Sequence, residues 1–277
     1  MQNIIVNTNW LYKNLGNKNL IIFDSSWHMP NTKRDAFKEF KQGHILESQY
    51  FDIDKISNKK TYLPHMTPSS DYFQKAMRSS GLNNTSIVVV YDTIGIYSSA
   101  RVWWLFKYFG HKEVYVLNGG LKKWIKENKP ITKKIIKPKI GNFKVKTNSF
   151  LKINYKIILK NLNRKNFIIL DARNKDRFEG KIKEPRPNLK SGHIPKSKNL
   201  FWGDLITNKG TFKSKNNLKK ILKKYKLKNK NIVTSCGSGI TACILSLGLI
   251  YSNNLSSKVY DGSWSEWGSI KGLPIKR

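Results

Sequence analysis

One of the two cysteines, Cys236, has the setting of a nucleophile. It follows a β-branched run, Ile232–Thr234, which predicts a short buried strand, and it precedes Gly237-Ser-Gly239 and an apolar run long enough for a helix. A strand, a glycine turn and a helix place one side chain at a helix N-terminus, where backbone N–H groups and the positive end of the helix dipole favour an anion. A cysteine in this position is predicted to be partly thiolate at neutral pH. The alternative is a buried, unreactive cysteine beside an ordinary turn.

The elements around Cys236 have counterparts in the first half of the chain, which indicates a duplication. Four landmarks recur at nearly one spacing: Asp24 and Asp171 are 147 residues apart, His44 and His193 are 149, Asp92 and Cys236 are 144, and Gly119 and Gly262 are 143. Asp92 cannot act as a thiol nucleophile, so only the second copy is predicted to be catalytic. We interpret the paired histidines as structural, the paired aspartates Asp24 and Asp171 as residues that fix loop geometry, and Cys243 as a buried core thiol.

Short apolar strands alternate with helices in both copies. This pattern predicts an α/β fold of two tandem domains, each a mainly parallel sheet flanked by helices. We expect a first domain over residues 1–130, a lysine-rich linker over 131–150 and a catalytic domain over 151–277. Trp264 and Trp267 are expected to pack in the core of the second domain.

Composition narrows the classes of function. The formal charge is +35, but the basic residues are mostly lysines spread along the whole chain, and no nucleic-acid-binding motif is present. We therefore expect no nucleic-acid partner, although the positive field should attract small anions. The N-terminal residues lack a signal-peptide pattern, and no apolar run is long enough to span a bilayer. The expectation is a cytoplasmic protein without a membrane partner, a metal site or a cofactor.

Several motifs resemble those of the two-domain rhodanese-type sulfurtransferases, and among them the 3-mercaptopyruvate sulfurtransferases. The motifs are Ser99-Ala-Arg-Val-Trp-Trp104, Asn118-Gly-Gly-Leu-Lys-Lys-Trp124, Gly192-His-Ile-Pro195, Cys236-Gly-Ser-Gly-Ile-Thr-Ala-Cys243 and Tyr260-Asp-Gly-Ser-Trp-Ser-Glu-Trp267. The resemblance covers nearly the whole chain. It implies rhodanese-like domains in which only the second carries the catalytic cysteine.

The resemblance also implies roles for particular residues. Beside Cys236, the family uses a serine, a histidine and an aspartate, which match Ser238, His65 and Asp54; Asp52 is a rival to Asp54 because both lie on one face of an extended segment. The predicted substrate-binding residues are two arginines and the loop that follows the cysteine: Arg177, Arg186, Gly237, Gly239, Ile240 and Thr241.

The side chains of the loop after Cys236 indicate which sulfur donor the site would prefer. Thiosulfate is a compact dianion that a basic side chain inside the loop would pair with, whereas Ser238, Ile240 and Thr241 are neutral. A donor whose charge lies on a carboxylate away from the sulfur needs its cations elsewhere, and the planar guanidinium groups of Arg177 and Arg186 suit that task.

The sequence therefore predicts transfer of sulfane sulfur from 3-mercaptopyruvate to a thiol or cyanide through a persulfide on Cys236, with a thioredoxin-like protein as a candidate acceptor. A thiosulfate:cyanide sulfurtransferase is the nearest alternative. A cysteine phosphatase is disfavoured because the loop ends in Thr241 and Ala242 rather than in a phosphate-binding arginine. A non-enzymatic sulfur carrier is the remaining alternative.

Overall fold

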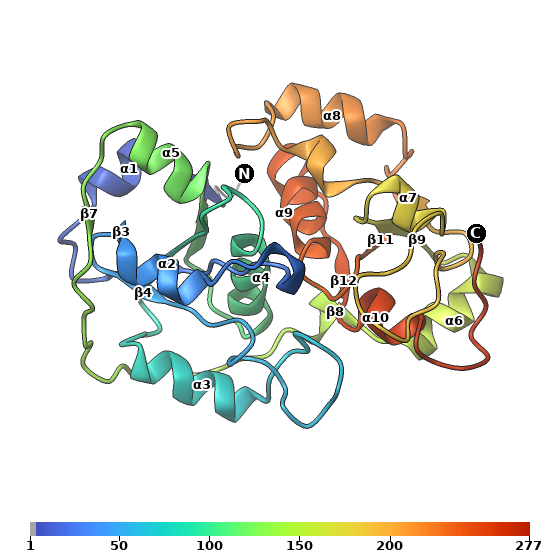
Figure 1. The fold of residues 1–277 in the computed structure, drawn as a ribbon, viewed down its shortest axis with the longest axis horizontal. Coiled ribbons are helices and arrows are strands. Elements are labelled where there is room, and N and C mark those ends of the chain that lie inside the picture. The colour runs from blue at the N-terminus through green and yellow to red at the C-terminus, as the bar shows by residue number, and fades with distance from the viewer. Residues whose placement is uncertain (1–3) are drawn as a thin grey trace. The chain divides into compact units, whose positions relative to one another are not determined.

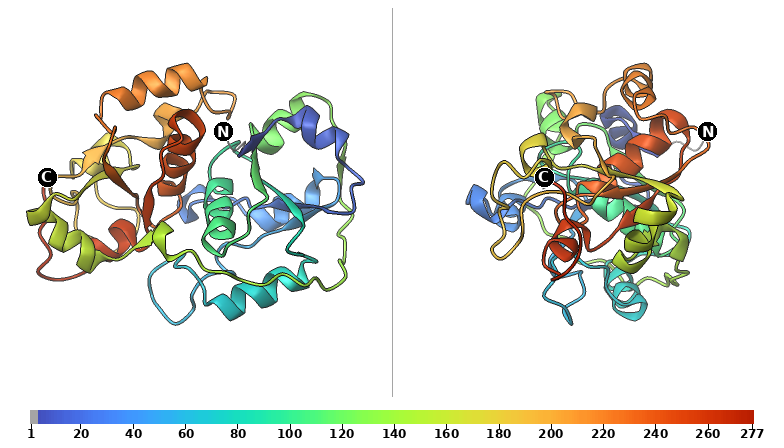
Figure 2. Two further views of the ribbon diagram at one scale, coloured as in Figure 1. Left: turned by 180° about the vertical axis from the view of Figure 1, so that it is seen from behind. Right: turned by 90° about the vertical axis from the view of Figure 1, so that its right-hand side faces the viewer.

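The computed structural model describes residues 4–277 and contains two compact units. Of the described residues, the first unit holds those up to Asn58 together with Thr67–Asn148 and Ile206–Phe212. The second unit holds Lys59–Met66, Ser149–Leu205 and Lys213–Arg277. Each unit is an α/β fold built on a five-stranded, entirely parallel sheet, as the alternating pattern predicted (Figures 1 and 2).

The first unit has the strand order β1-β6-β5-β2-β4. Its strands are β1 (Ile5–Val6), β2 (Leu20–Asp24), β4 (Ser48–Tyr50), β5 (Ile87–Tyr91) and β6 (Val114–Leu117), with β3 (His44–Ile45) and β7 (Ile131–Thr132) forming a separate antiparallel pair. Its helices are α1 (Thr8–Lys13), α2 (Ala36–Gln42), α3 (Ser70–Ser79), α4 (Ser99–Tyr108) and α5 (Gly120–Lys126), with a 3-10 turn at Pro30–Thr32. The central strand β5 is apolar on both faces because helices cover both sides of the sheet.

The second unit repeats this order as β8-β12-β11-β9-β10. Its strands are β8 (Lys152–Ile153), β9 (Phe167–Asp171), β10 (Lys198–Asn199), β11 (Asn231–Ser235) and β12 (Lys258–Tyr260). Its helices are α6 (Tyr155–Arg164), α7 (Lys175–Phe178), α8 (Lys215–Lys223), α9 (Ala242–Asn253) and α10 (Ser263–Trp267), with 3-10 turns at Ser149–Leu151 and Trp202–Leu205. The matching strand orders agree with a duplication.

Details of packing also recur between the copies. His44 and His193 each stack on a phenylalanine ring, and the Nδ1 atom of each lies 2.7 Å from that phenylalanine's carbonyl oxygen, so both histidines are structural as predicted. Trp124 donates from Nε1 to the carbonyl of Pro130, and Trp267 donates in the same way to Pro274. Trp267 and Trp264 are buried in the core cluster of the second unit, as expected.

Two short segments are exchanged between the halves of the chain: each is part of the unit that consists mainly of residues from the opposite half. Lys59–Met66 comes from the first half but is part of the second unit, and Ile206–Phe212 comes from the second half but is part of the first. The two segments begin 147 residues apart, which is the repeat spacing of Asp24 and Asp171. We call them the reciprocal arms. The first of them carries His65.

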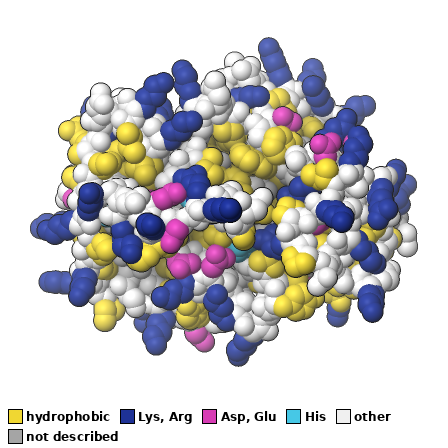
Figure 3. Space-filling view, in the orientation of Figure 1, with side chains coloured by type: hydrophobic (Ala, Val, Ile, Leu, Met, Phe, Trp, Pro, Cys, Tyr) yellow, Lys and Arg dark blue, Asp and Glu magenta, His cyan; other side chains and the backbone are white. Residues whose placement is uncertain are grey.

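The basic side chains are scattered on the surface. On the face drawn in Figure 3, lysine and arginine side chains project all over the surface rather than gathering in one stripe. Within residues 4–277, no helix is both long enough and apolar enough to cross a membrane.

Candidate active site

Cys236 lies in the loop between β11 and α9, with only 1% of its surface exposed. The N–H of Gly239 donates to Cys236 Sγ at 3.1 Å, so the loop folds back over the sulfur. Gly239 has a φ of +80°, a conformation that favours glycine. The predicted arrangement of strand, glycine turn and helix is present, and the cysteine is the residue that the turn encloses.

Helix α10 fixes the loop from its other side. The N–H of Trp264 donates to the carbonyl oxygen of Cys236 at 2.9 Å, and Ser265 donates to the carbonyl of Gly237 from both its N–H and its hydroxyl. The hydroxyl oxygen of Ser263 accepts a hydrogen bond from the N–H of Cys236 at 3.1 Å and lies 3.8 Å from its Sγ. These bonds hold the backbone of Cys236 in one position.

The equivalent loop of the first unit shows what such a backbone can bind. One carboxylate oxygen of Asp92 accepts hydrogen bonds from the N–H groups of Ile94 and Gly95, at 3.0 and 2.8 Å. The other accepts from Tyr97 and Ser99, at 2.8 and 2.9 Å. The first copy of the loop is therefore an anion-binding nest occupied by its own aspartate. In the second copy, cysteine stands at the position of that aspartate.

His65 and Ser238 are brought together by the first reciprocal arm. His65 Nδ1 lies 3.0 Å from Ser238 Oγ, and the histidine residue is only 4% exposed. Its φ of +60° is unusual for a residue with a β-carbon, and such strain is found where the surroundings impose a conformation on a side chain. The structure thus places two of the predicted catalytic residues at the cysteine loop.

The predicted aspartate has other contacts. Asp54 belongs to the first unit, where its Oδ2 accepts a hydrogen bond from Trp27 Nε1 at 2.9 Å. Its rival Asp52 caps a turn by accepting from the N–H of Lys55. A role for Asp54 beside His65 therefore stays a prediction.

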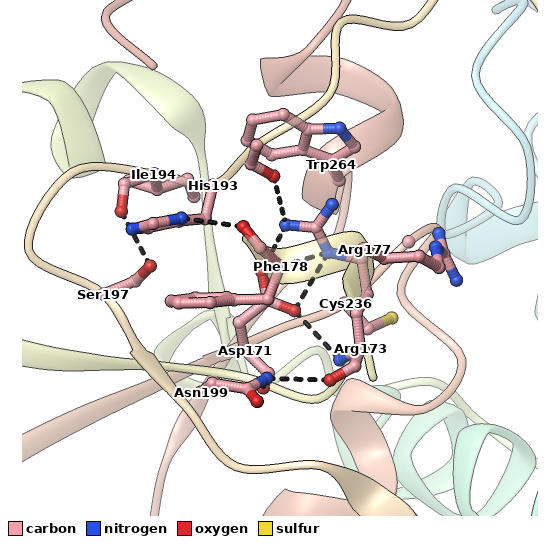
Figure 4. A network of polar contacts seen from close by, with 12 residues as sticks. Asp171, Arg173, Arg177, Phe178, His193, Ile194, Ser197, Asn199, Cys236 and Trp264 are labelled. Atoms are coloured by element: carbon pink, nitrogen blue, oxygen red, sulfur yellow. Dashed lines mark hydrogen bonds and ion pairs between the residues drawn. The ribbon is translucent and has the colours of Figure 1, made fainter. Parts of the chain in front are cut away.

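A buried ionic network lies under the cysteine loop (Figure 4). Arg173 pairs with Asp171 through Nη2 at 2.7 Å and with Glu184 through Nη1 at 2.8 Å, and its guanidinium lies 4.4 Å from the centre of the Trp264 ring. Burial alone would lower the pKa of Arg173, but the carboxylates of Asp171 and Glu184 outweigh burial and raise the pKa above its ordinary value. The guanidinium is therefore charged. Asp171 Oδ1 also accepts a hydrogen bond from the backbone N–H of Arg173 at 3.0 Å, so Asp171 fixes the loop after β9, as expected.

Arg177 extends this network to the loop. Its Nη2 contacts Glu184 Oε2 at 2.5 Å, and its side chain is 19% exposed, whereas that of Glu184 is 2% exposed. A β-carbon added to Gly237 would lie 3.0 Å from Arg177 Nη2, so the guanidinium rests against the residue that follows Cys236. The structure thus brings the predicted cation Arg177 to the loop.

The remaining predicted residues differ in their exposure. Ile240 is buried and Thr241 half-buried, both directly before α9. Arg186 is half-buried, two residues after Glu184, and its part in substrate binding stays a prediction. Cys243 is buried and its Sγ donates to the carbonyl of Gly239, as suits a core thiol. Among the described residues, no group of three or more His, Cys, Asp or Glu side chains is placed to hold a metal ion.

Sequence reasoning missed Arg173, Glu184 and the α10 serines. Arg173 follows the strand-ending Asp171 by two residues, a spacing that could have suggested a local ion pair. Glu184 is the single acidic residue between residues 180 and 203, in a segment rich in lysine. Its isolation among basic residues could have suggested an ion pair. Ser263 and Ser265 flank Trp264, which the sequence predicts only as a core residue.

Comparisons with known proteins show the family of the chain. A family model described as a rhodanese-like domain matches residues 7–127 and again 155–270. A protein of Arabidopsis thaliana named thiosulfate/3-mercaptopyruvate sulfurtransferase 1, mitochondrial, is 36% identical, over 98% of this chain and 78% of the relative. The 3-mercaptopyruvate sulfurtransferase of Mus musculus is 38% identical, over 90% of this chain and 84% of the relative.

Comparison with a solved structure also shows a rhodanese fold. The crystal structure of SseA from Escherichia coli, described among the 3-mercaptopyruvate sulfotransferases, matches with a TM-score of 0.86 and 30% identity, over 95% of this chain and 99% of that chain. The fold class expected from the sequence is confirmed. The chain belongs to the rhodanese family of sulfurtransferases.

Proposed function

We propose that the enzyme takes sulfur from 3-mercaptopyruvate, holds it as a persulfide on Cys236 and passes it to a thiol or cyanide. The observation that carries this proposal is the position of Arg177. Its guanidinium rests against Gly237, while the loop side chains themselves are neutral. A carboxylate bound by Arg177 would leave the donor's sulfur free to approach Cys236, and a guanidinium suits a carboxylate.

In the first half-reaction, the Cys236 thiolate attacks the sulfur of the donor. The S–S bond forms as the C–S bond of 3-mercaptopyruvate breaks, and the electron pair moves into the adjacent carbonyl system as the enolate of pyruvate. Protonation of the enolate carbon gives pyruvate. The pair of His65 and Ser238 lies beside the loop and would relay a proton, because an imidazole near neutral pH can both accept and donate one.

In the second half-reaction, an acceptor thiolate or cyanide attacks the outer sulfur of the persulfide and releases Cys236 as a thiolate. No cofactor is required for this ping-pong scheme. The nest occupied by Asp92 in the first unit supports the idea that the second loop holds an anionic persulfide by its N–H groups. We propose a thiol protein of the thioredoxin type as the acceptor.

Replacement of the nucleophile tests the scheme. Cys236→Ser should abolish pyruvate release and leave the circular dichroism spectrum and melting temperature near those of the wild type. The matched control is Cys243→Ser, which keeps a donor for the Gly239 carbonyl and should retain activity. Pyruvate release by Cys236→Ser near the wild-type rate would disprove the proposal.

Thiosulfate is the competing donor, and the name of the Arabidopsis relative includes both substrates. The values of kcat/KM for the two donors, measured on one preparation, decide between them. We expect the value for 3-mercaptopyruvate to be the larger. The reverse order would favour a thiosulfate:cyanide sulfurtransferase.

A further inference from the structure

We propose that Glu184 sets the preference of the site for a donor with one negative charge. This inference rests on the proposed function and adds a residue to it. Glu184 touches neither Cys236 nor the loop in any described contact, but it binds both Arg173 and Arg177. It would therefore act on the donor through Arg177, as a positioning residue.

The contacts of Glu184 divide the guanidinium of Arg177 into two edges. Glu184 accepts from Nε at 3.3 Å and from Nη2 at 2.5 Å, so it occupies the inner edge. The outer edge, formed by Nη1 and Nη2, faces Gly237, whose added β-carbon would lie 3.9 and 3.0 Å from these atoms. A donor carboxylate can therefore meet Arg177 only by its outer edge, and Glu184 fixes the direction in which that edge points.

The charges of the network cancel. Asp171 and Glu184 supply two carboxylates and Arg173 and Arg177 supply two guanidinium groups, all joined by contacts of 2.5 to 2.8 Å. The side chains of Asp171, Arg173 and Glu184 are at most 2% exposed, so water screens these charges little. Arg177 thus presents hydrogen-bond donors to the loop from a cluster with no net charge.

The consequence for the donor follows from charge. A cluster without net charge can bind the single carboxylate of 3-mercaptopyruvate through directed hydrogen bonds. The same cluster gives little extra attraction to thiosulfate, a dianion whose charge is concentrated beside the sulfur to be transferred. Removing the negative charge of Glu184 would leave a net positive charge beside the loop and loosen the orientation of Arg177. The net positive charge would favour binding of a dianion, and the looser orientation of Arg177 would weaken binding of the carboxylate.

Glu184→Gln is the variant that tests this. We expect kcat/KM for 3-mercaptopyruvate to fall, mainly through KM, while that for thiosulfate stays level or rises, so that the ratio of the two shifts by at least about tenfold towards thiosulfate. Glu184→Asp keeps the charge and should hold the ratio near the wild-type value even if both activities fall. The matched control is Glu179→Gln, which removes a partly exposed glutamate paired with Lys175 and Lys181 and should leave both donors unchanged.

Equal losses with both donors in Glu184→Gln would overturn the proposal, because a purely structural role affects both alike. The same shift of the ratio in Glu184→Asp would also overturn it, since charge would then not be the cause. If Glu184→Gln fails to fold, Asp171→Asn removes one charge from the same network without touching Arg177, and it must shift the ratio in the same direction. A wild-type enzyme that releases no pyruvate from 3-mercaptopyruvate would instead refute the proposed function.

Discussion

The buried carboxyl of Asp24 should make the first unit less stable as the pH rises. Asp24 is the counterpart of Asp171, but Ser26 stands at the position of Arg173 and contributes a backbone N–H in place of a guanidinium. Burial raises the pKa of Asp24 from 3.8 to about 6, against the opposing effect of its hydrogen bonds to Ser26. The folded protein therefore holds a proton on Asp24 between these two values while the unfolded chain has lost it.

The sign and size of the effect follow from this difference. The contribution of Asp24 to the stability of the folded unit is greatest below pH 3.8. This contribution falls as the pH rises to about 6 and is constant at higher pH. The loss amounts to about 3 kcal/mol, since one pH unit corresponds to about 1.4 kcal/mol. Asp24→Asn cannot ionise and should regain most of that stability at pH 8, while its advantage should fade towards pH 4.

Hydrogen exchange measured by mass spectrometry on peptides from β2 and β5 reports the stability of this unit separately from the other. Protection of these peptides in Asp24→Asn should exceed that of the wild type at pH 8 and match it near pH 4, after correction for the intrinsic exchange rate. The exposed Asp71→Asn serves as the control and should show no such trend. A variant that is less protected than the wild type at pH 8 would refute this reasoning, because it would mean that the ionised carboxylate stabilises the fold.

Further substitutions at four positions test the loops. Asp92→Ala leaves four backbone N–H groups without their acceptor and should destabilise the first unit by about 2–5 kcal/mol. Asp92→Asn should have an intermediate effect. An unchanged denaturation midpoint in both variants would contradict the idea that this loop is stabilised by binding the carboxylate. His65→Ala should slow persulfide formation about 10²–10⁴-fold in single-turnover assays. Adding Ser238→Ala to this variant should lower the rate little further, whereas additive losses would mean that the two residues act separately. Gly237→Ala should push the guanidinium of Arg177 aside and raise KM for 3-mercaptopyruvate about tenfold with little change in melting temperature; an unaltered KM would show that this contact does not matter.

The fold could be predicted because its signals are local and repeated. Strand Ile87–Tyr91 is a short apolar run, and strand Asn231–Ser235 contains a β-branched run at Ile232–Thr234. The spacing of Asp24 and Asp171 indicates which elements of the two copies correspond. The position of Cys236 followed from the same logic, since strand, glycine turn and helix are adjacent in the chain.

Long-range pairs were harder to predict. The contact of His65 with Ser238 spans 173 residues, and only the resemblance to a family suggested it, because a histidine in a polar loop carries no periodic signal. The reciprocal arms were missed for the same reason: turn-rich segments do not reveal which sheet they pack against. The partners of Glu184 depend on the path of the irregular segment between α7 and β10, which neither composition nor spacing determines.

The central claim is that sulfur is carried on Cys236, and a mass measurement tests it most directly. Purified enzyme should be reduced, exposed to 3-mercaptopyruvate without an acceptor, and analysed as an intact protein and as peptides. We expect the gain of one sulfur atom on the peptide that contains Cys236, with loss of that sulfur when cyanide is added and the matching release of pyruvate. Pyruvate release without any added sulfur on that peptide, or with the sulfur on Cys243 instead, would contradict the account.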